Sequence, residues 1–415
     1  MGYEIGSPAD NLATEVIELT DNFFDDPHTV YDQLRGRGAV HRVRLPDSGL
    51  GWLVTDYEVA KAAFTDPAIS KVLKSPGAKA TVAAEGGDRH LGGSMFADMM
   101  VFYDPPEHTR LRGLVNRAFS GRAMAELSPR ISELADELLA DLASDRGEVV
   151  DLLERFAVPL GMSVICELLG VPSTDRDAFQ RWSTSLLSSE ESNEARATAV
   201  MDFVRYIDQL IRTKDATPGR DLLSELIAAR QDDDRLSHRE LISMVFLLLV
   251  AGFETTVNLI GNGVAIFLAD KNLHQALLAD PDRIPAFIEE VLRFEAPATE
   301  ATFRYTTAPT TLGGIEIPQD QLILISMAAA DRDPTQFPDP HRFDPDRSPN
   351  HIAFGHGIHR CVGAPLARTE SAIALTRLLS TYPNLELAPD TGLHWRKSLI
   401  VRGLTALPVR LPLNC

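Results

Sequence analysis

Apolar residues recur at helical spacing over most of the chain. Between Pro105 and about Phe294 they repeat every three or four residues, which predicts a series of amphipathic or buried helices. Glycine, proline or short polar runs interrupt the pattern at Gly121, 170–172, 188–193 and 217–221, so we expect helices to break there. The middle of the chain is therefore predicted to be almost entirely helical.

Strand-like patterns are confined to the two ends of the sequence. Near the N-terminus, Asp26 and Pro27 predict the start of a helix that stops near Gly38. Residues 39–45 and 51–55 alternate in polarity on either side of a turn, as the two strands of a β-hairpin do.

The C-terminal third mixes both patterns. Short strands are predicted over 312–317, 321–326 and 407–411, with a helix from about 364 to 379. No repeat or linker divides the chain, so we expect a mainly α fold with a minor β portion, built as a single large domain over 1–415.

The longest apolar run, Leu241–Phe253, lies in a predicted helix over about 237–269. This run is too short to cross a bilayer, so we interpret it as part of a core helix and expect no membrane span. The N-terminal residues carry acidic and polar side chains rather than the apolar segment of a signal peptide.

Composition narrows the possible partners and the compartment. The chain has 40 basic and 59 acidic residues, a net charge of −19, which argues against a nucleic-acid or anionic-membrane partner. The three cysteines, Cys166, Cys361 and Cys415, are too few and too scattered for a disulfide framework. We therefore expect a cytoplasmic protein.

Cys361 stands in an unusual setting, between glycines and ahead of a predicted helix. It could be a buried structural thiol, a zinc ligand with His356 and His359, or a thiolate ligand of haem iron. Glycine lets backbone approach a flat ring closely, and the start of the following helix stabilises an anionic sulfur. Haem ligation therefore accounts for the neighbouring glycines as well as for the cysteine.

The segment "FGHGIHRCVG", Phe354–Gly363, resembles the cysteine-ligand loop of the cytochrome P450 family. Three further motifs of that family follow the expected order: "DPPEHTRLRGLV" from Asp104, "LLLVAGFETTVN" from Leu247, and "EEVLRFEAP" from Glu289. Together the matches extend from about Asp104 to Val409. The resemblance implies a soluble, bacterial-type haem-thiolate domain of the kind that tailors natural products.

The resemblance also implies which residues hold the cofactor, haem b. Cys361 would supply the axial thiolate and so be the iron ligand. The residues that match the family's propionate-binding positions are His108, Arg112, Arg304 and His359.

Two further roles follow from the resemblance. Glu254 and Thr255 match the acid–alcohol pair of the oxygen-binding groove, and the hydroxyl of Thr255 is expected to bond the carbonyl of Ala251 and bend the helix. Glu290 and Arg293 match a structural pair that an arginine from a later loop joins, and Arg342 stands at the matching place.

The implied activity is a monooxygenase reaction, in which one atom of dioxygen enters the substrate by hydroxylation or epoxidation. The chain contains no iron–sulfur or nucleotide-binding motif, so a ferredoxin and its reductase are expected as electron donors. A local excess of arginine could dock the acidic ferredoxin, and solvated helix charge explains it equally well. These residues are Arg110, Arg112, Arg117, Arg122 and Arg130. We expect a monomer.

The substrate is expected to be a bulky, mostly apolar natural product resembling a polyketide or macrolide. A methionine-rich loop, Thr81–Phe102, is predicted to cover the pocket. Further lining is expected from Val245, Phe246, Leu249, Phe253, Ala298, Thr299, Leu399 and Ile400. Two alternatives stay open: oxidative coupling or ring formation without oxygen insertion, and a non-catalytic haem-thiolate recruitment module.

Overall fold

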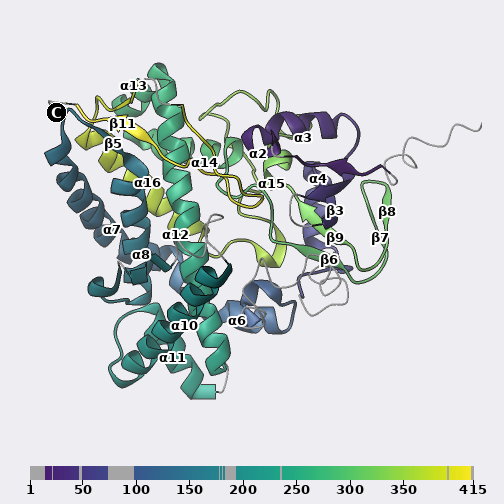
Figure 1. The fold of residues 1–415 in the computed structure, drawn as a ribbon, viewed down its shortest axis with the longest axis horizontal. Coiled ribbons are helices and arrows are strands. Elements are labelled where there is room, and N and C mark those ends of the chain that lie inside the picture. The colour runs from purple at the N-terminus through teal and green to yellow at the C-terminus, as the bar shows by residue number, and fades with distance from the viewer. Residues whose placement is uncertain are drawn as a thin grey trace, which may run out of the picture. The chain divides into compact units, whose positions relative to one another are not determined.

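The computed structural model divides into two compact units that the chain enters more than once (Figure 1). Unit 1 comprises 1–88, 289–361 and 394–403, and unit 2 comprises 89–288, 362–393 and 404–415. The structure describes residues 15–20, 22–45, 49–72, 98–176, 178–179, 181–182, 193–233, 236–389 and 392–412. The single domain over 1–415 stays a prediction.

Unit 1 is built on a six-stranded sheet with the order β1-β2-β3-β9-β6-β4 and a separate β7–β8 hairpin. The strands are β1 (Ile17–Glu18), β2 (Val40–Leu45), β3 (Gly49–Val54), β4 (Ile69–Ser70), β6 (Arg304–Thr306), β7 (Thr310–Leu312), β8 (Ile315–Ile317) and β9 (Leu322–Ile325). β2 and β3 pair antiparallel from Val40↔Val54 to Leu45↔Gly49, which confirms the predicted hairpin. β9 then pairs parallel to β3, and its alternate residues enter two different apolar clusters, so both faces of the sheet are covered.

The helices of unit 1 are short, and one of them begins at Pro27 as predicted. They are α2 (Asn22–Asp25), α3 (Pro27–Arg35), α4 (Tyr57–Thr65), α15 (Met327–Ala330) and the 3-10 turn η8 (Gly357–His359). The Asp26 side chain accepts a hydrogen bond from the amide of Thr29, so it caps α3 as predicted. Gly313 and Gly314 have φ of +54° and +81°, the left-handed conformation that a tight two-residue hairpin turn requires.

Unit 2 is helical, as the apolar periodicity predicted (Figure 1). Its α-helices are α6 (Glu107–Val115), α7 (Gly121–Asp141), α8 (Val158–Leu169), α10 (Asn193–Ala216), α11 (Leu222–Asp233), α12 (His238–Ala269), α13 (Lys271–Ala279) and α16 (Ala364–Thr381). The tighter or wider turns are η2 (Met100–Phe102), η3 (Asn116–Phe119), η4 (Leu142–Asp145), the π-helical η5 (Leu153–Ala157), η6 (Ser173–Asp175) and η7 (Pro281–Arg283). A three-stranded sheet, β10-β11-β5, combines β5 (Val149–Asp151), β10 (Glu386–Leu387) and β11 (Pro408–Arg410). α14 (Ile284–Phe294) begins in unit 2 and ends in unit 1.

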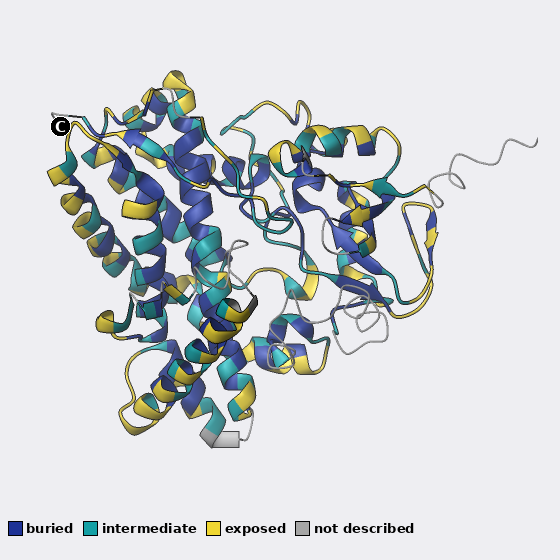
Figure 2. Ribbon diagram, in the orientation of Figure 1, coloured by how far each residue is buried: buried dark blue, intermediate teal, exposed yellow. Residues whose placement is uncertain are grey.

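α12 is the central helix of unit 2 and is buried along most of its length (Figure 2). Ser237 and Glu240 form a reciprocal capping box at its start. Its contacts include α8, α10 and α16, and a Cβ on Gly252 would lie 2.8 Å from Cδ1 of Ile165, so a larger residue would require the Ile165 side chain of α8 to shift.

The apolar run Leu241–Phe253 is itself too short for a membrane, but it is part of the longer helix α12. Among the described residues α12 is the one helix that is long and apolar enough to cross a bilayer. Yet 67% of its most apolar window is buried inside the protein, which is the environment of a core helix.

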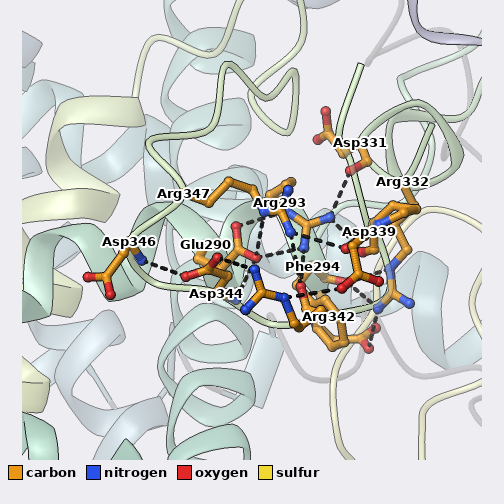
Figure 3. Close-up of polar contacts among 12 residues, drawn as sticks. Glu290, Arg293, Phe294, Asp331, Arg332, Asp339, Arg342, Asp344, Asp346 and Arg347 are labelled. Carbon is orange, nitrogen blue, oxygen red and sulfur yellow. Dashed lines mark hydrogen bonds and ion pairs between the residues drawn. The ribbon is translucent and has the colours of Figure 1, made fainter. Parts of the chain in front are cut away.

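A buried ion cluster in unit 1 fixes the loops that lead to the cysteine segment (Figure 3). The side chains of Glu290 and Arg293 are both fully buried and joined by two hydrogen bonds, Nη2 to Oε1 at 2.7 Å and Nε to Oε2 at 2.8 Å. The guanidinium of Arg293 also donates to the carbonyl oxygens of Asp331, Pro340 and Arg342. Its five donors are therefore used to hold three segments of chain together.

The third side chain of this cluster is Arg347, and our assignment of Arg342 was wrong. The Nε of Arg347 lies 3.4 Å from Oε1 of Glu290, and the Arg347 side chain is 13% exposed. Arg342 contributes only its carbonyl, because its side chain turns outward to Asp339 and Asp344 and is 62% exposed. The motif spacing could not distinguish two arginines five residues apart on the same loop.

We predict that Arg347→Ala lowers the free energy of unfolding by about 2 kcal/mol, because it leaves the buried Glu290 carboxylate with one cation fewer. The matched variant Arg342→Ala should change it by about 0.5 kcal/mol or less, since exposed ion pairs contribute little. Urea unfolding followed by circular dichroism measures the free energy of unfolding of both variants. An equal decrease in the two would show that the Arg342 side chain also stabilises the cluster.

Candidate functional site

The cysteine loop is closed by a backbone hydrogen bond that only a glycine-rich sequence allows. The amide of Cys361 donates to the carbonyl of Phe354 at 2.8 Å. Between them the chain reverses through Gly355 and Gly357, whose φ angles of +74° and +72° are strained for any side chain. The cysteine is exposed, and α16 begins three residues later with a proline in its first turn. This places an accessible thiol directly before a helix N-terminus.

α4 supports the cysteine loop from within unit 1. A Cβ on Gly357 would lie 3.2 Å from Cγ2 of Thr65, and one on Gly355 would lie 3.7 Å from the ring of Phe64. The same Phe64 ring lies 4.6 Å beneath the guanidinium of Arg304. Phe64 therefore joins the β6 arginine to the cysteine loop. No motif in the sequence pointed to it.

Arg304 and His359 complete the site residues of unit 1. Arg304 is 3% exposed, and its Nη1 donates to the carbonyl of Thr302 at 2.8 Å. His359 ends the turn η8, two residues before the cysteine. An accessible soft thiol with a buried guanidinium nearby is the donor set that haem requires, since iron binds the sulfur and the propionates bind the guanidinium.

In unit 2, His108 and Arg112 lie one turn apart on the same face of α6. His108 is 3% exposed, whereas Arg112 is partly exposed and its Nε donates to Oδ1 of Asn116 at 2.9 Å. The spacing agrees with a pair of propionate ligands.

Glu254 and Thr255 lie on the partly exposed side of α12. The hydroxyl of Thr255 donates to the carbonyl of Ala251 at 3.2 Å, which confirms the predicted side-chain bond to the preceding turn. Ala251 is exposed as well, so these three positions form an accessible strip on a helix that is buried over most of its length.

Phe246 and Phe253 face away from that strip. The ring of Phe246 packs 5.2 Å from that of Phe203 on α10, and Phe253 is 6% exposed. Val245 and Leu249 are fully buried. The structure thus places these four expected lining residues in the helical core.

Two other expected lining segments do meet inside unit 1. The amide and hydroxyl of Thr299 bond the carbonyls of Ile400 and Leu399, both at 3.0 Å, and Ala298 pairs with Val401. Most of the expected Thr81–Phe102 loop, residues 81–97, lies outside the described residues, as does Cys415.

Comparisons with known proteins agree with this geometry. The sequence model of the family Cytochrome P450 matches residues 171–397. Cytochrome P450 107B1 of Saccharopolyspora erythraea is 45% identical over 400 residues, which cover 95% of this chain and 98% of that protein. The 6-deoxyerythronolide B hydroxylase of the same organism is 42% identical, covering 94% of this chain and 98% of its own. The solved structure of the P450 monooxygenase TamI bound to tirandamycin C superposes with a TM-score of 0.88 at 43% identity, covering 95% of this chain and all of that one.

These similarities extend over nearly the whole chain and agree with the mainly α architecture and the cysteine loop. The chain therefore belongs to the cytochrome P450 family: it is a monooxygenase whose cofactor is haem b, with a cysteine thiolate as the axial ligand of the iron.

Proposed function

We propose that this monooxygenase hydroxylates or epoxidises a bulky, mostly apolar natural product of the polyketide or macrolide kind. It works in the cytoplasm as a monomer and takes its electrons from a ferredoxin and its reductase. The observation that carries the proposal is the accessible strip of Glu254 and Thr255 on α12, because an acid beside a hydroxyl is the arrangement that proton delivery to dioxygen needs.

The cofactor residues have distinct tasks in this proposal. When bound, thiolate-ligated haem supplies the centre at which dioxygen is reduced and its O–O bond is cleaved. Cys361 holds the iron, and the start of α16 favours the anionic form of its sulfur. The propionate-binding residues orient the ring through directional ion pairs and hydrogen bonds. They are His108, Arg112, Arg304 and His359.

The hydroxyl of Thr255 acts as the proton carrier. Its hydrogen is directed to the Ala251 carbonyl, which leaves the oxygen lone pairs toward the accessible side of the helix. There the hydroxyl can accept a proton that Glu254 brings from solvent and release its own. The carboxyl is reprotonated in turn, so both side chains are restored after each transfer.

The named relatives support the substrate class, since one is a 6-deoxyerythronolide B hydroxylase and another was solved with tirandamycin C. Met99, Met100 and Phe102, at the described end of the expected pocket loop, are apolar and buried. Apolar surface of this kind favours a neutral ligand over a charged one.

Arg117 is the arginine best placed to attract a ferredoxin. Arg110, Arg122 and Arg130 each contact a glutamate, so their charges are partly neutralised within the protein. Arg110 also lies on the side of α6 opposite His108. Arg117 is exposed and forms no ion pair with the described residues.

We predict that Thr255→Ala keeps its haem and binds substrate, but lowers product formed per electron consumed by about tenfold and raises peroxide release, because proton delivery is lost. The buried neighbour gives the control: Thr256→Ser should stay within about twofold of the wild type. Unchanged coupling in Thr255→Ala would remove this residue from the mechanism.

A second prediction concerns the electron donor. Arg117→Glu should raise the ferredoxin KM by about tenfold at low salt and much less at high salt, because salt screens exposed charges. Arg130→Gln, which removes an already paired charge, is the matched control and should change little. Peroxide-driven turnover should be preserved in both, and an equal loss with peroxide would indicate misfolding.

The third prediction tests the substrate. Bulky neutral polyketides and macrocycles should shift the Soret band to shorter wavelength, because each Å² of apolar surface removed from water contributes about 25 cal/mol. Short fatty acids and amino acids should give no shift. A response to small anions alone would overturn the substrate class, and a product with a new ring but no added oxygen would establish oxidative coupling instead.

A further inference from the structure

Two segments of unit 1, 297–299 and 399–402, pair side by side as a short ribbon. Ala298 forms an antiparallel bridge with Val401, and the amide and hydroxyl of Thr299 bond two further carbonyls of the second segment at 3.0 Å. The ribbon carries four of the residues expected to line the substrate pocket. Whatever holds the ribbon in place therefore bears on which substrates fit.

A buried ion pair lies at the base of this ribbon. Glu295 precedes Ala298 by three residues, and Arg402 follows Val401 directly. Nε of Arg402 lies 2.8 Å from Oε1 of Glu295, and the two side chains are 7% and 11% exposed. The amide of Arg402 also donates to the carbonyl of Pro297 at 2.9 Å. The ion pair and the backbone bond thus join the two segments at the same end.

Arg402 also fastens the ribbon to other parts of unit 1. Its Nη1 donates to the carbonyl of Phe24 on α2 at 2.8 Å, and its guanidinium lies 3.8 Å over the ring of Trp395. A guanidinium has several donors in a rigid plane, so contacts in different directions fix its position. One side chain therefore connects the ribbon to α2 and to Glu295, the residue that follows α14.

The carboxylate of Glu295 is the charge that holds this guanidinium. Nε2 of His28 lies 3.4 Å from its Oε1, and Nη2 of Arg332 lies 3.8 Å from its Oε2. Burial acts to raise the pKa of Glu295, but the hydrogen bond from His28 and the charges of His28, Arg402 and Arg332 outweigh it and lower the pKa to about 2. The ion pair is therefore present at every pH near neutrality.

The ribbon presents apolar side chains that a ligand can reach. Ala298, Leu399 and Ile400 are each partly exposed, whereas Thr299 is buried and used in the pairing. Because hydrogen bonds tie these residues to the end that carries Arg402, a shift of that end moves them together.

We propose that the ion pair of Arg402 and Glu295 determines substrate specificity by fixing where this ribbon lies, which sets the size of ligand that the ribbon side of the pocket accepts. Both are positioning residues, since they act through the ribbon. The consequence for natural substrates rests on the substrate class proposed above.

The proposal is tested without turnover by two nitrogen ligands of the haem iron that differ in size, imidazole and econazole. Imidazole is too small to reach beyond the iron, whereas econazole carries two chlorinated aromatic rings. Arg402→Met keeps the length of the side chain and removes its charge and donors. It should raise the Kd of econazole about tenfold, because the lost charged hydrogen bonds free the ribbon, and leave the Kd of imidazole within about twofold. Titration of the Soret band of the holoenzyme measures both constants.

Rescue and control variants separate positioning from general stability. Arg402→Lys keeps the charge and should stay within about threefold of the wild-type Kd for econazole, while Glu295→Gln should resemble Arg402→Met. Arg332→Gln is the matched control, because it removes another cation near the same carboxylate. Arg332 donates to the carbonyl of Phe294 rather than to the ribbon, so the ratio of the two Kd values should stay within about twofold.

The outcomes decide the proposal in each case. An equal loss of affinity for both azoles in Arg402→Met would indicate damage to the haem site and overturn it, as would an unchanged ratio. If Arg402→Met does not fold, an unchanged ratio in Glu295→Gln overturns the proposal instead. Arg332→Gln as selective as Arg402→Met would assign the effect to the whole ion cluster and also overturn it. A changed ratio in an enzyme that binds no polyketide or macrocycle would support the ion pair and refute the substrate class.

Discussion

The cysteine segment depends on the contacts of one fully buried charge, the guanidinium group of Arg293. A charge removed from water must be neutralised and its N–H groups bonded, or the fold loses several kcal/mol. Glu290 neutralises it, and the carbonyls of three loop positions take its remaining donors. Those carbonyls belong to 331–342, the stretch that leads into the cysteine loop. One satisfied charge thus fixes a long segment with little regular structure.

Backbone conformation and packing explain why glycine and aromatic residues surround the thiol. Closing a loop between Phe354 and Cys361 requires positive φ at two positions, which glycine adopts without strain. Phe64 then fills the space behind this loop and supports the Arg304 guanidinium. Cys361 and Arg304 are consequently held by the same part of unit 1.

In unit 2 the acid and the hydroxyl lie on a helix rather than in a loop. α12 is buried over most of its length, and the accessible strip of Ala251, Glu254 and Thr255 carries the acid and the hydroxyl. Neighbouring helices hold α12 on its other faces, where Gly252 and Gly161 allow α8 to pack closely. Close packing and polar function are therefore opposite sides of one helix.

The sequence alone determined the features that depend on local spacing. Periodicity placed the helices and the N-terminal hairpin, while the glycine-flanked Cys361 and the Glu254–Thr255 pair indicated the chemistry. Each of these signals consists of residues that lie within a few positions of one another. Only the tertiary structure decided which side chains turn inward and which turn toward solvent. It replaced Arg342 with Arg347 beside Glu290, directed Phe246 and Phe253 into the core, and brought Phe64 under Arg304. Such choices are made by packing between segments far apart in the chain, and no local pattern encodes them.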